Sequence, residues 1–474
     1  MFPDNQKPDS HKIPAREALV VAIVSVVVTG LLFYLKYPPR LPYADEFEYL
    51  GYAFGIHKFG VFGQVSSDTT LAPGASMFFP PLYPHFLAAL MAADQTFAAT
   101  TSCVLINIGG GADGAITTSG CDPRYGLAIP VQVLIAGLVP FFIWATARRL
   151  SGSTSIAVIA ALLALAARSY VYYANHFLTE ALTLPLAAAL GWAMVAAWQD
   201  RTSRAVVVSA VCFGLLVLTR AGWSYAALVI IPIFLWMGVM SWRACGARAF
   251  LPAIFFVMAT TAILSPWIIR NAVLFDTPAL TGGYGAKALM HRLPYNRMTN
   301  DEWKAAFVYW LPDFGDSLAA RIFPKEQYQR LDFGYPNGFY TSERLAFAAE
   351  VEVKRGGQDI FDYLIEQEIM GNLGKHIMVT LAMVWRGMFA AKYLGLIGWI
   401  FFLPLFIFAL HRRWAALIVL ALPPLFMLGL NAFVSVSIPR YNLPLIPVLA
   451  FSIAYVMVNA VSRLRRKYDR VRAP

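Results

Sequence analysis

The feature that most constrains this chain is a series of apolar runs, each long enough to cross a lipid bilayer as a helix. Such a helix needs about 20 apolar residues. The first run, Ala18–Leu35, carries no charge and is followed by Lys36-Tyr37-Pro38-Pro39 instead of a small-residue cleavage site, so we expect it to stay as an anchor. With this run, the pattern predicts about ten spans, the others at 125–146, 153–173, 177–198, two within 205–242, 250–268, 393–410, 414–433 and 438–461.

Composition agrees with a membrane protein. Hydrophobic residues make up 58% of the 474 and charged residues 14%. A water-soluble domain usually has fewer hydrophobic and more charged residues than this. We therefore predict an all-α, polytopic integral membrane protein with extracytoplasmic juxtamembrane helices. The 38 Lys and Arg exceed the 27 Asp and Glu, but they cluster between apolar runs and at the C-terminus. The positive-inside rule explains this better than a nucleic-acid partner, which we do not expect.

The basic loops also predict the orientation of the chain. Residues 1–16 carry Lys7, Lys12 and Arg16 and should form a cytoplasmic N-terminus, and residues 462–474 a basic cytoplasmic tail. Between them we expect a transmembrane catalytic module with its first outer loop, an extracytoplasmic subdomain, and C-terminal transmembrane helices, at 17–270 (loop 36–124), 271–392 and 393–461. A helix at 79–97 that crossed the bilayer would put Arg148-Arg149 outside, so we expect it to be re-entrant or interfacial.

Two cysteines, Cys103 and Cys121, share the first outer loop. A disulfide between them would fit an oxidising compartment, and two unpaired thiols are the alternative.

An acidic stretch, Pro39–Tyr52, follows the first span directly. On a helical wheel its apolar and polar residues separate, with Phe47, Leu50, Gly51 and Phe54 on one stripe and Asp45, Glu48, Tyr49 and Tyr52 on the other. This pattern predicts a short helix on the membrane surface with its carboxylates outward. The alternative is local: Asp45 is an N-cap and Glu48 completes a capping box.

The predicted topology gathers polar residues at the outer surface. Arginines at outer span ends oppose the positive-inside bias, so they need either a structural partner or an anionic lipid ligand. For Arg220, Arg270 and Arg440 together, the ligand is at least as good an explanation. The set comprises Asp45, Glu46, Glu48, Tyr83, Arg168, Tyr172, Tyr173, His176, Glu180, Arg220, Arg270, Arg440 and Tyr441.

Carboxylates and arginines beside an apolar cavity suit the transfer of a sugar from a polyprenyl-phosphate carrier. The phosphate leaving group needs cationic stabilisation and no general acid. One carboxylate can take the acceptor's proton while the acceptor attacks the opposite face of the anomeric carbon, which implies inversion.

Several short motifs also resemble, in the same order, those of the GT-C superfamily of membrane glycosyltransferases. The resemblance spans nearly the whole chain and is strongest to the bacterial dolichyl-phosphate-mannose-protein mannosyltransferase branch, which is similar to the aminoarabinose transferases. The motifs are Asp45-Glu46, Pro80-Pro81-Leu82-Tyr83-Pro84, Ala147-Arg148-Arg149-Leu150, Leu178-Thr179-Glu180, Leu218-Thr219-Arg220, Pro266-Trp267-Ile268-Ile269-Arg270-Asn271 and Arg440-Tyr441.

The resemblance implies roles for these residues. Asp45 corresponds to a catalytic base, with Glu46 beside it, and the acceptor or sugar site would include Glu48, Tyr83, His85 and Glu180. The carrier phosphate would be bound by Arg220, Arg270, Arg440 and Tyr441. Two departures stand out: Arg168 occupies a position where proline is common, and no lysine precedes Pro80-Pro81, which makes Arg220 a substitute for phosphate binding.

The expected partners are a polyprenyl-phosphate-linked sugar donor, a lipid, glycan or protein acceptor, and membrane lipids. Metal use varies in the superfamily. The sequence requires no cofactor, and it leaves open whether the protein uses a divalent cation. We expect a multi-pass protein of the bacterial inner (plasma) membrane with its active site on the periplasmic face. One alternative is a transporter or flippase of lipid-linked sugars, which should carry charges at mid-membrane in broken helices; another is a non-catalytic assembly subunit.

Overall fold

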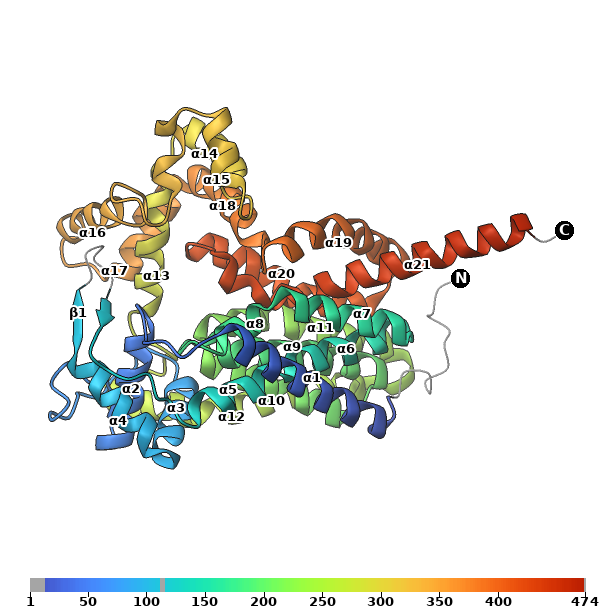
Figure 1. Ribbon diagram of the computed structural model, residues 1–474, viewed down its shortest axis with the longest axis horizontal. Coiled ribbons are helices and arrows are strands. Elements are labelled where there is room, and N and C mark those ends of the chain that lie inside the picture. The colour runs from blue at the N-terminus through green and yellow to red at the C-terminus, as the bar shows by residue number, and fades with distance from the viewer. Residues whose placement is uncertain (1–12, 111–115, 473–474) are drawn as a thin grey trace. The chain divides into compact units, whose positions relative to one another are not determined.

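The computed structural model describes residues 13–110 and 116–472, and helices account for most of them (Figure 1). The described residues contain one two-stranded antiparallel sheet, β1 (Ile108–Gly110) with β2 (Ile116–Thr118), in which Gly109 pairs with Thr117. The prediction of an all-α fold is therefore confirmed. The described helices and strands form two compact units, one with residues up to 280, 405–420 and those from 450, the other with 281–404 and 421–449.

Long apolar helices form the body of the first unit. Helix α9 packs on α6 and α10, α10 packs on α12, and α1 packs on α5 and α6 (Figure 1). Along its apolar stretch, α9 is 72% buried, whereas α1 is 17% buried. Helix α9 is therefore central in the unit and α1 is peripheral. Alanines on α9 permit this close packing, because small side chains let helix backbones approach one another. The helices of this unit before residue 281 are α1 Ala15–Lys36, α2 Glu46–Phe59, α3 Leu82–Ala93, α4 Gln95–Ile106, α5 Ala128–Ala136, α6 Leu138–Ser151, α7 Thr154–Ala167, α8 Ser169–Tyr173, α9 Glu180–Asp200, α10 Ser203–Thr219, the 3-10 helix η3 Ala221–Ala226, α11 Ala227–Cys245, the 3-10 helix η4 Gly246–Phe250 and α12 Leu251–Phe275.

Each predicted span coincides with a helix, but the count of ten is not confirmed. By length and composition, seven helices in the described part of the chain can cross a membrane, or eight if α3 and α4 form one broken span. One of the seven is the continuous stretch Ala221–Phe275, which includes α11 and α12. Helices α7 and α10, with 14 and 17 residues, are shorter than a full span.

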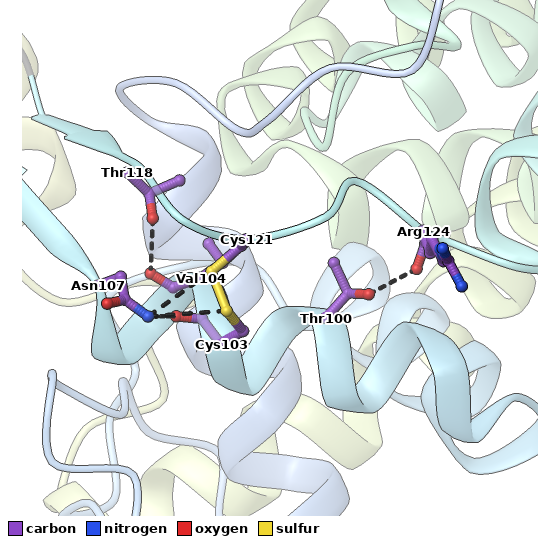
Figure 2. The surroundings of a disulfide bond; sticks show 7 residues. All are labelled: Thr100, Cys103, Val104, Asn107, Thr118, Cys121 and Arg124. Carbon is purple, nitrogen blue, oxygen red and sulfur yellow. Dashed lines mark hydrogen bonds between the residues drawn. A yellow bond between two sulfur atoms is a disulfide. The ribbon is translucent and has the colours of Figure 1, made fainter.

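The first outer loop folds into three helices and a hairpin. The predicted helix at 79–97 is wrong at its C-terminal end: α3 stops at Ala93, and Asp94 begins α4 by accepting a hydrogen bond from the Thr96 amide at 2.9 Å. The two helices meet at a bend of 119°. Cys103 and Cys121 form a disulfide beside the β-hairpin (Figure 2), so the first of the two alternatives that the sequence left open is the one observed. The disulfide links α4 to the segment that leads to α5.

The second unit contains residues 281–392, here called the polar segment, which make up most of the predicted extracytoplasmic subdomain, and parts of the last three apolar helices. Tyr295, Phe339, Met383 and Val436 belong to its hydrophobic core. The elements from residue 281 onward are α13 Tyr284–Arg292, η5 Leu293–Arg297, α14 Asn300–Tyr309, α15 Gly315–Ile322, η6 Lys325–Gln327, η7 Gln329–Leu331, α16 Ser342–Lys354, α17 Ile360–Tyr363, the π-helix η8 Leu364–Ile369, η9 Met370–Asn372, α18 Leu373–Met388, α19 Tyr393–Arg412, α20 Ala415–Val434, η10 Pro439–Leu445 and α21 Ile446–Arg472.

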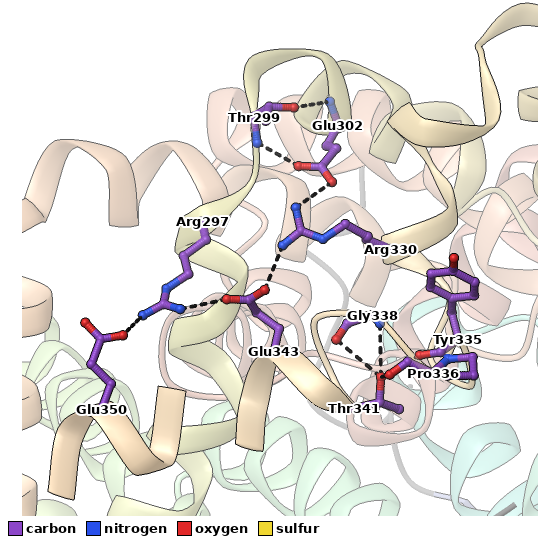
Figure 3. Close-up of polar contacts among 10 residues, drawn as sticks. All are labelled: Arg297, Thr299, Glu302, Arg330, Tyr335, Pro336, Gly338, Thr341, Glu343 and Glu350. Carbon is purple, nitrogen blue, oxygen red and sulfur yellow. Dashed lines mark hydrogen bonds and ion pairs between the residues drawn. The ribbon is translucent and has the colours of Figure 1, made fainter. Parts of the chain in front are cut away.

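Ion pairs account for several acids of the polar segment. Arg330 contacts Glu302 at 3.1 Å and Glu343 at 3.0 Å, and Arg297 contacts Glu343 at 2.7 Å and also Glu350 (Figure 3). Glu302 additionally closes a capping box at the start of α14. This network ties η5, η7, α14 and α16 together, so these carboxylates have a structural role.

Candidate functional site

The candidate site begins at the turn between the first span and α2. Ala44 has φ 51°, a left-handed conformation that turns the chain into the helix. Asp45 occupies the N-cap position but is in the α region, and its side chain makes no capping hydrogen bond. The capping-box alternative for Asp45 and Glu48 is therefore wrong. The Asp45 side chain is exposed and Glu48 is half-buried.

Glu46, the neighbour of Asp45, has the opposite environment. Its side chain is 3% exposed and forms an ion pair with Arg40 through Oε1. The backbone amide of Phe177 donates to its other oxygen, Oε2, at 3.2 Å. Burial raises the pKa of Glu46 to about 7, although Arg40 and the Phe177 amide both oppose the rise. Glu46 thus joins the start of α2 to the segment that leads into α9.

Helix α2 is covered on more than one face. Tyr49 and Tyr52 are 9% and 3% exposed, and both rings pack against Phe79, with centroids 4.9 and 5.4 Å away. The prediction that the stripe of Tyr49 and Tyr52 faces outward is therefore wrong. The loop after α2 and the start of α3 fold back over this stripe, a packing that helical periodicity does not reveal.

Tyr83 and Glu180 lie at the same end of the first unit's helices. The Tyr83 hydroxyl donates to Gln132 Oε1 at 2.8 Å and interacts electrostatically with both Glu46 and Glu180. Glu180 is the first residue of α9, where the helix dipole favours a carboxylate. Its Oε1 lies 3.4 Å from Nη1 of Arg220, at the C-cap of α10. The structure therefore brings these predicted residues together from four parts of the chain.

Arg270 lies near the C-terminal end of α12 and contacts the first outer loop. Its Nη1 donates to the carbonyl oxygen of Ser76 at 3.0 Å and to Asn271 Oδ1 at 2.8 Å. The guanidinium carbon is 4.5 Å from the Trp267 ring centroid and 5.4 Å from that of Phe62. Stacking of this kind holds the planar guanidinium in a fixed orientation.

His85 is exposed, and its ring stacks on that of Phe62, which also contacts Arg270, with the His85 and Phe62 centroids 5.6 Å apart. Its Nδ1 lies 2.7 Å from the Pro81 carbonyl oxygen. Arg440 and Tyr441 belong to η10 of the second unit, where the guanidinium carbon is 5.3 Å from the Tyr441 ring centroid.

Two residues of the site were not predicted from the sequence. Gln132 is fully buried in α5 and, besides accepting from Tyr83, donates to the carbonyl oxygen of Ala174 at 3.1 Å. A single carboxamide in an apolar run was the available signal, because a buried amide needs hydrogen-bond partners. Arg40 lies within the acidic stretch, and its pairing with Glu46 could be found only by folding the loop.

The backbone conformation of Arg168 explains why this chain departs here from the family's common proline. Arg168 caps α7 with φ 55°, a conformation closed to proline, whose φ is held near −65°. The backbone at this position therefore requires a residue other than proline. Within the residues described, no group of three or more His, Cys, Asp or Glu side chains could hold a metal ion.

Comparison with known proteins finds one family model that is similar to part of the chain. Residues 126–269 match the family model described as dolichyl-phosphate-mannose-protein mannosyltransferase. This segment runs from just before α5 to within α12 and includes Gln132, Glu180 and Arg220. No curated protein sequence matches the chain.

Three solved structures are similar to the chain at low sequence identity. The yeast (S. cerevisiae) protein O-mannosyltransferase Pmt1-Pmt2 complex, bound to the sugar donor, is 13% identical over 61% of this chain and 38% of its own, with a TM-score of 0.43. The oligosaccharyltransferase AglB from Archaeoglobus fulgidus, in complex with an inhibitory peptide and a dolichol-phosphate, is 14% identical over 96% and 52%, with a TM-score of 0.47. ArnT from Cupriavidus metallidurans, bound to undecaprenyl phosphate, is 14% identical over 92% and 77%, with a TM-score of 0.39.

The chain thus spans about half or less of the first two neighbours' length. The family match over residues 126–269 agrees with the resemblance to dolichyl-phosphate-mannose-protein mannosyltransferases that the motifs indicated.

Proposed function

We propose that the chain is a glycosyltransferase that uses a polyprenyl-phosphate-linked sugar and moves the sugar, with inversion, to an extracytoplasmic lipid, glycan or protein acceptor. The family match supports the reaction class. The observation that carries the proposal is the contrast between two adjacent carboxylates: Asp45 is exposed, whereas Glu46 is buried and holds Arg40 and the Phe177 amide.

This contrast separates two roles. An exposed carboxylate can accept a proton from an incoming hydroxyl or amine, which is the task of a general base. Both oxygens of Glu46 are engaged by Arg40 and Phe177. In this proposal Asp45 is the catalytic base and Glu46 positions it, because Glu46 anchors the first turn of α2.

The transfer is a single displacement. A lone pair on the acceptor oxygen or nitrogen attacks the anomeric carbon, its proton passes to Asp45, and the bond from that carbon to the phosphate oxygen breaks. Polyprenyl phosphate leaves as an anion and needs positive charge. In the first unit, Arg220 and Arg270 are proposed to supply this positive charge. In the second unit, Arg440 is proposed to supply it, with Tyr441 beside it.

The remaining roles follow from position. Glu180 orients Arg220 through their ion pair, and Tyr83, Glu48 and His85 are proposed to contact sugar or acceptor. We place the reaction at the periplasmic face of a bacterial inner membrane, because the predicted topology puts Asp45 outside, after the first span.

The test is turnover of a panel of polyprenyl-phosphate sugars by the purified full chain, followed by mass spectrometry. Wild type should consume one donor, and Asp45→Asn should slow that reaction by about 10²- to 10⁴-fold, the usual effect of a general base. Asp122→Asn is the matched control, since Asp122 is an exposed carboxylate of the same outer loop, paired with Arg124. Full activity in a correctly inserted Asp45→Asn variant would refute the assignment of the base, and no turnover of any donor by wild type would refute the transferase.

A further inference from the structure

The second unit contains a cavity that the proposed transfer reaction does not use. It lies between α13 and α16, beside the start of α17, and has a volume of about 360 Å³. Three basic side chains line it, Lys287 and His291 from α13 and Arg344 from α16. Apolar side chains make up much of the remaining wall, among them Met290, Leu345 and Ile360.

Two hydrogen bonds hold the Arg344 side chain in the cavity in a fixed orientation. Its Nε donates to the carbonyl oxygen of Tyr340 at 2.9 Å, and its Nη1 lies 3.1 Å from Nε2 of His291. These bonds leave the second amino group, Nη2, without a hydrogen-bond partner among residues 13–110 and 116–472. A guanidinium fixed in this way can bind an oxyanion with little loss of side-chain entropy.

The electrostatic environment of the cavity favours an anion. None of the described residues that line it is acidic. Gly283, which also lines it, is the N-cap of α13 and has φ 77°. The N-terminus of α13 therefore adds its partial positive charge to that of Lys287 and Arg344.

The apolar wall indicates what accompanies the anion. Leu345 is 64% exposed although it lines the cavity, and Met290 and Ile360 are half-buried. A small hydrated ion would leave this surface in water, whereas a hydrocarbon chain would cover it. Each methylene group that becomes buried adds to the affinity, because apolar surface leaves water.

We propose that this cavity binds the phosphate group of an amphiphilic ligand, with Lys287 and Arg344 at the phosphate and the hydrocarbon chain against Met290, Leu345 and Ile360. The proposal does not depend on the glycosyltransferase assignment. A lipid headgroup and a free phosphate ester share the anionic chemistry, and the apolar wall favours the lipid.

The test is calorimetric titration of the full chain in nanodiscs of zwitterionic lipid, with empty nanodiscs subtracted. Inorganic phosphate and butyl, hexyl and octyl phosphate serve as probes. Affinity should rise with chain length, and Lys287→Gln and Arg344→Gln should each weaken octyl phosphate about tenfold. Lys325→Gln, which removes an exposed lysine of η6 outside the cavity, should have no effect.

A second variant tests the place of binding without changing charge. Ala348→Trp would fill the cavity from α16 and should abolish binding of octyl phosphate. Equal affinities for inorganic and octyl phosphate would refute the proposal that the ligand is amphiphilic. Binding that survives Ala348→Trp, or that both charge variants leave unchanged, would overturn the site.

Discussion

The ion pair between Arg40 and Glu46 offers the sharpest test of how the candidate site is held together. Replacing Arg40 with methionine keeps an unbranched side chain but removes the counter-charge of a carboxylate that is 3% exposed. Breaking one partner of a buried ion pair generally costs about 3–5 kcal/mol, because the other charge stays buried. Glu46 has an alternative, since it can become protonated, so the cost should depend on pH.

The sign of this dependence follows from the pKa of Glu46. Its folded-state pKa is raised from 4.5 to about 7, chiefly by burial, so the fold favours the protonated form. The associated stability is fully present below about pH 4.5 and is lost as pH rises through about 7, a change of about 3 kcal/mol. Without Arg40 the folded-state pKa rises further, so the Arg40→Met variant should lose stability mainly above pH 7.

The assay is thermal unfolding of the protein in detergent micelles, with the apparent Tm compared at about pH 5 and about pH 8.5. Arg40→Met should lie close to wild type at the acidic pH and well below it at the alkaline pH. The matched variant is Glu46→Gln, a neutral isostere that can still accept from the Phe177 amide; combined with Arg40→Met it should remove most of the alkaline loss. An equal loss at both pH values, or no rescue by Glu46→Gln, would refute the reasoning.

Three further predictions test the fold, the first with a control substitution. Gly126→Ala should cost about 1–3 kcal/mol or more, because the residue has φ 45° and its new Cβ would collide with the Asp94 carboxylate; Gly60→Ala, at a left-handed glycine with open space, should cost less in the same melting assay. Cys103→Ser opens a disulfide that spans 18 residues and should cost about 3 kcal/mol, with a lower Tm that reductant no longer affects. Arg330→Met removes the link between two carboxylates (Figure 3) and should raise hydrogen exchange in α14 and α16, and unchanged exchange there would contradict the structural role of the network.

Much of the helical framework could be predicted from the sequence, because apolar length and basic loops act locally. The segment 177–198 predicted a span, and α9 runs from Glu180 to Asp200. The boundary at Asp94 was not predicted, although aspartate is one of the residues preferred at a helix N-cap. The apolar character of residues 79–97 outweighed that signal, and the bend depends on packing that hydropathy does not measure.

The site was predicted in part. The outer-surface prediction grouped Asp45, Glu46, Tyr83, Glu180 and Arg220, and the structure brings Tyr83, Glu180 and Arg220 to the same helix ends as the Glu46 carboxylate. Their catalytic and binding roles stay predictions. The grouping succeeded because helix direction alternates across a bilayer, so that the ends of successive spans return to the same side.

By itself, the sequence determined that the chain is helical, suited to a membrane, and marked by acids and arginines at span ends, since these follow from composition, run length and charge order. Only the tertiary structure decided which of two adjacent carboxylates is exposed. Asp45 and Glu46 are alike in their chemistry and differ by one helical position, and it is the approach of Arg40 and Phe177, distant from each other in sequence, that buries one and leaves the other exposed. Burial depends on contacts between distant segments, which no local pattern encodes.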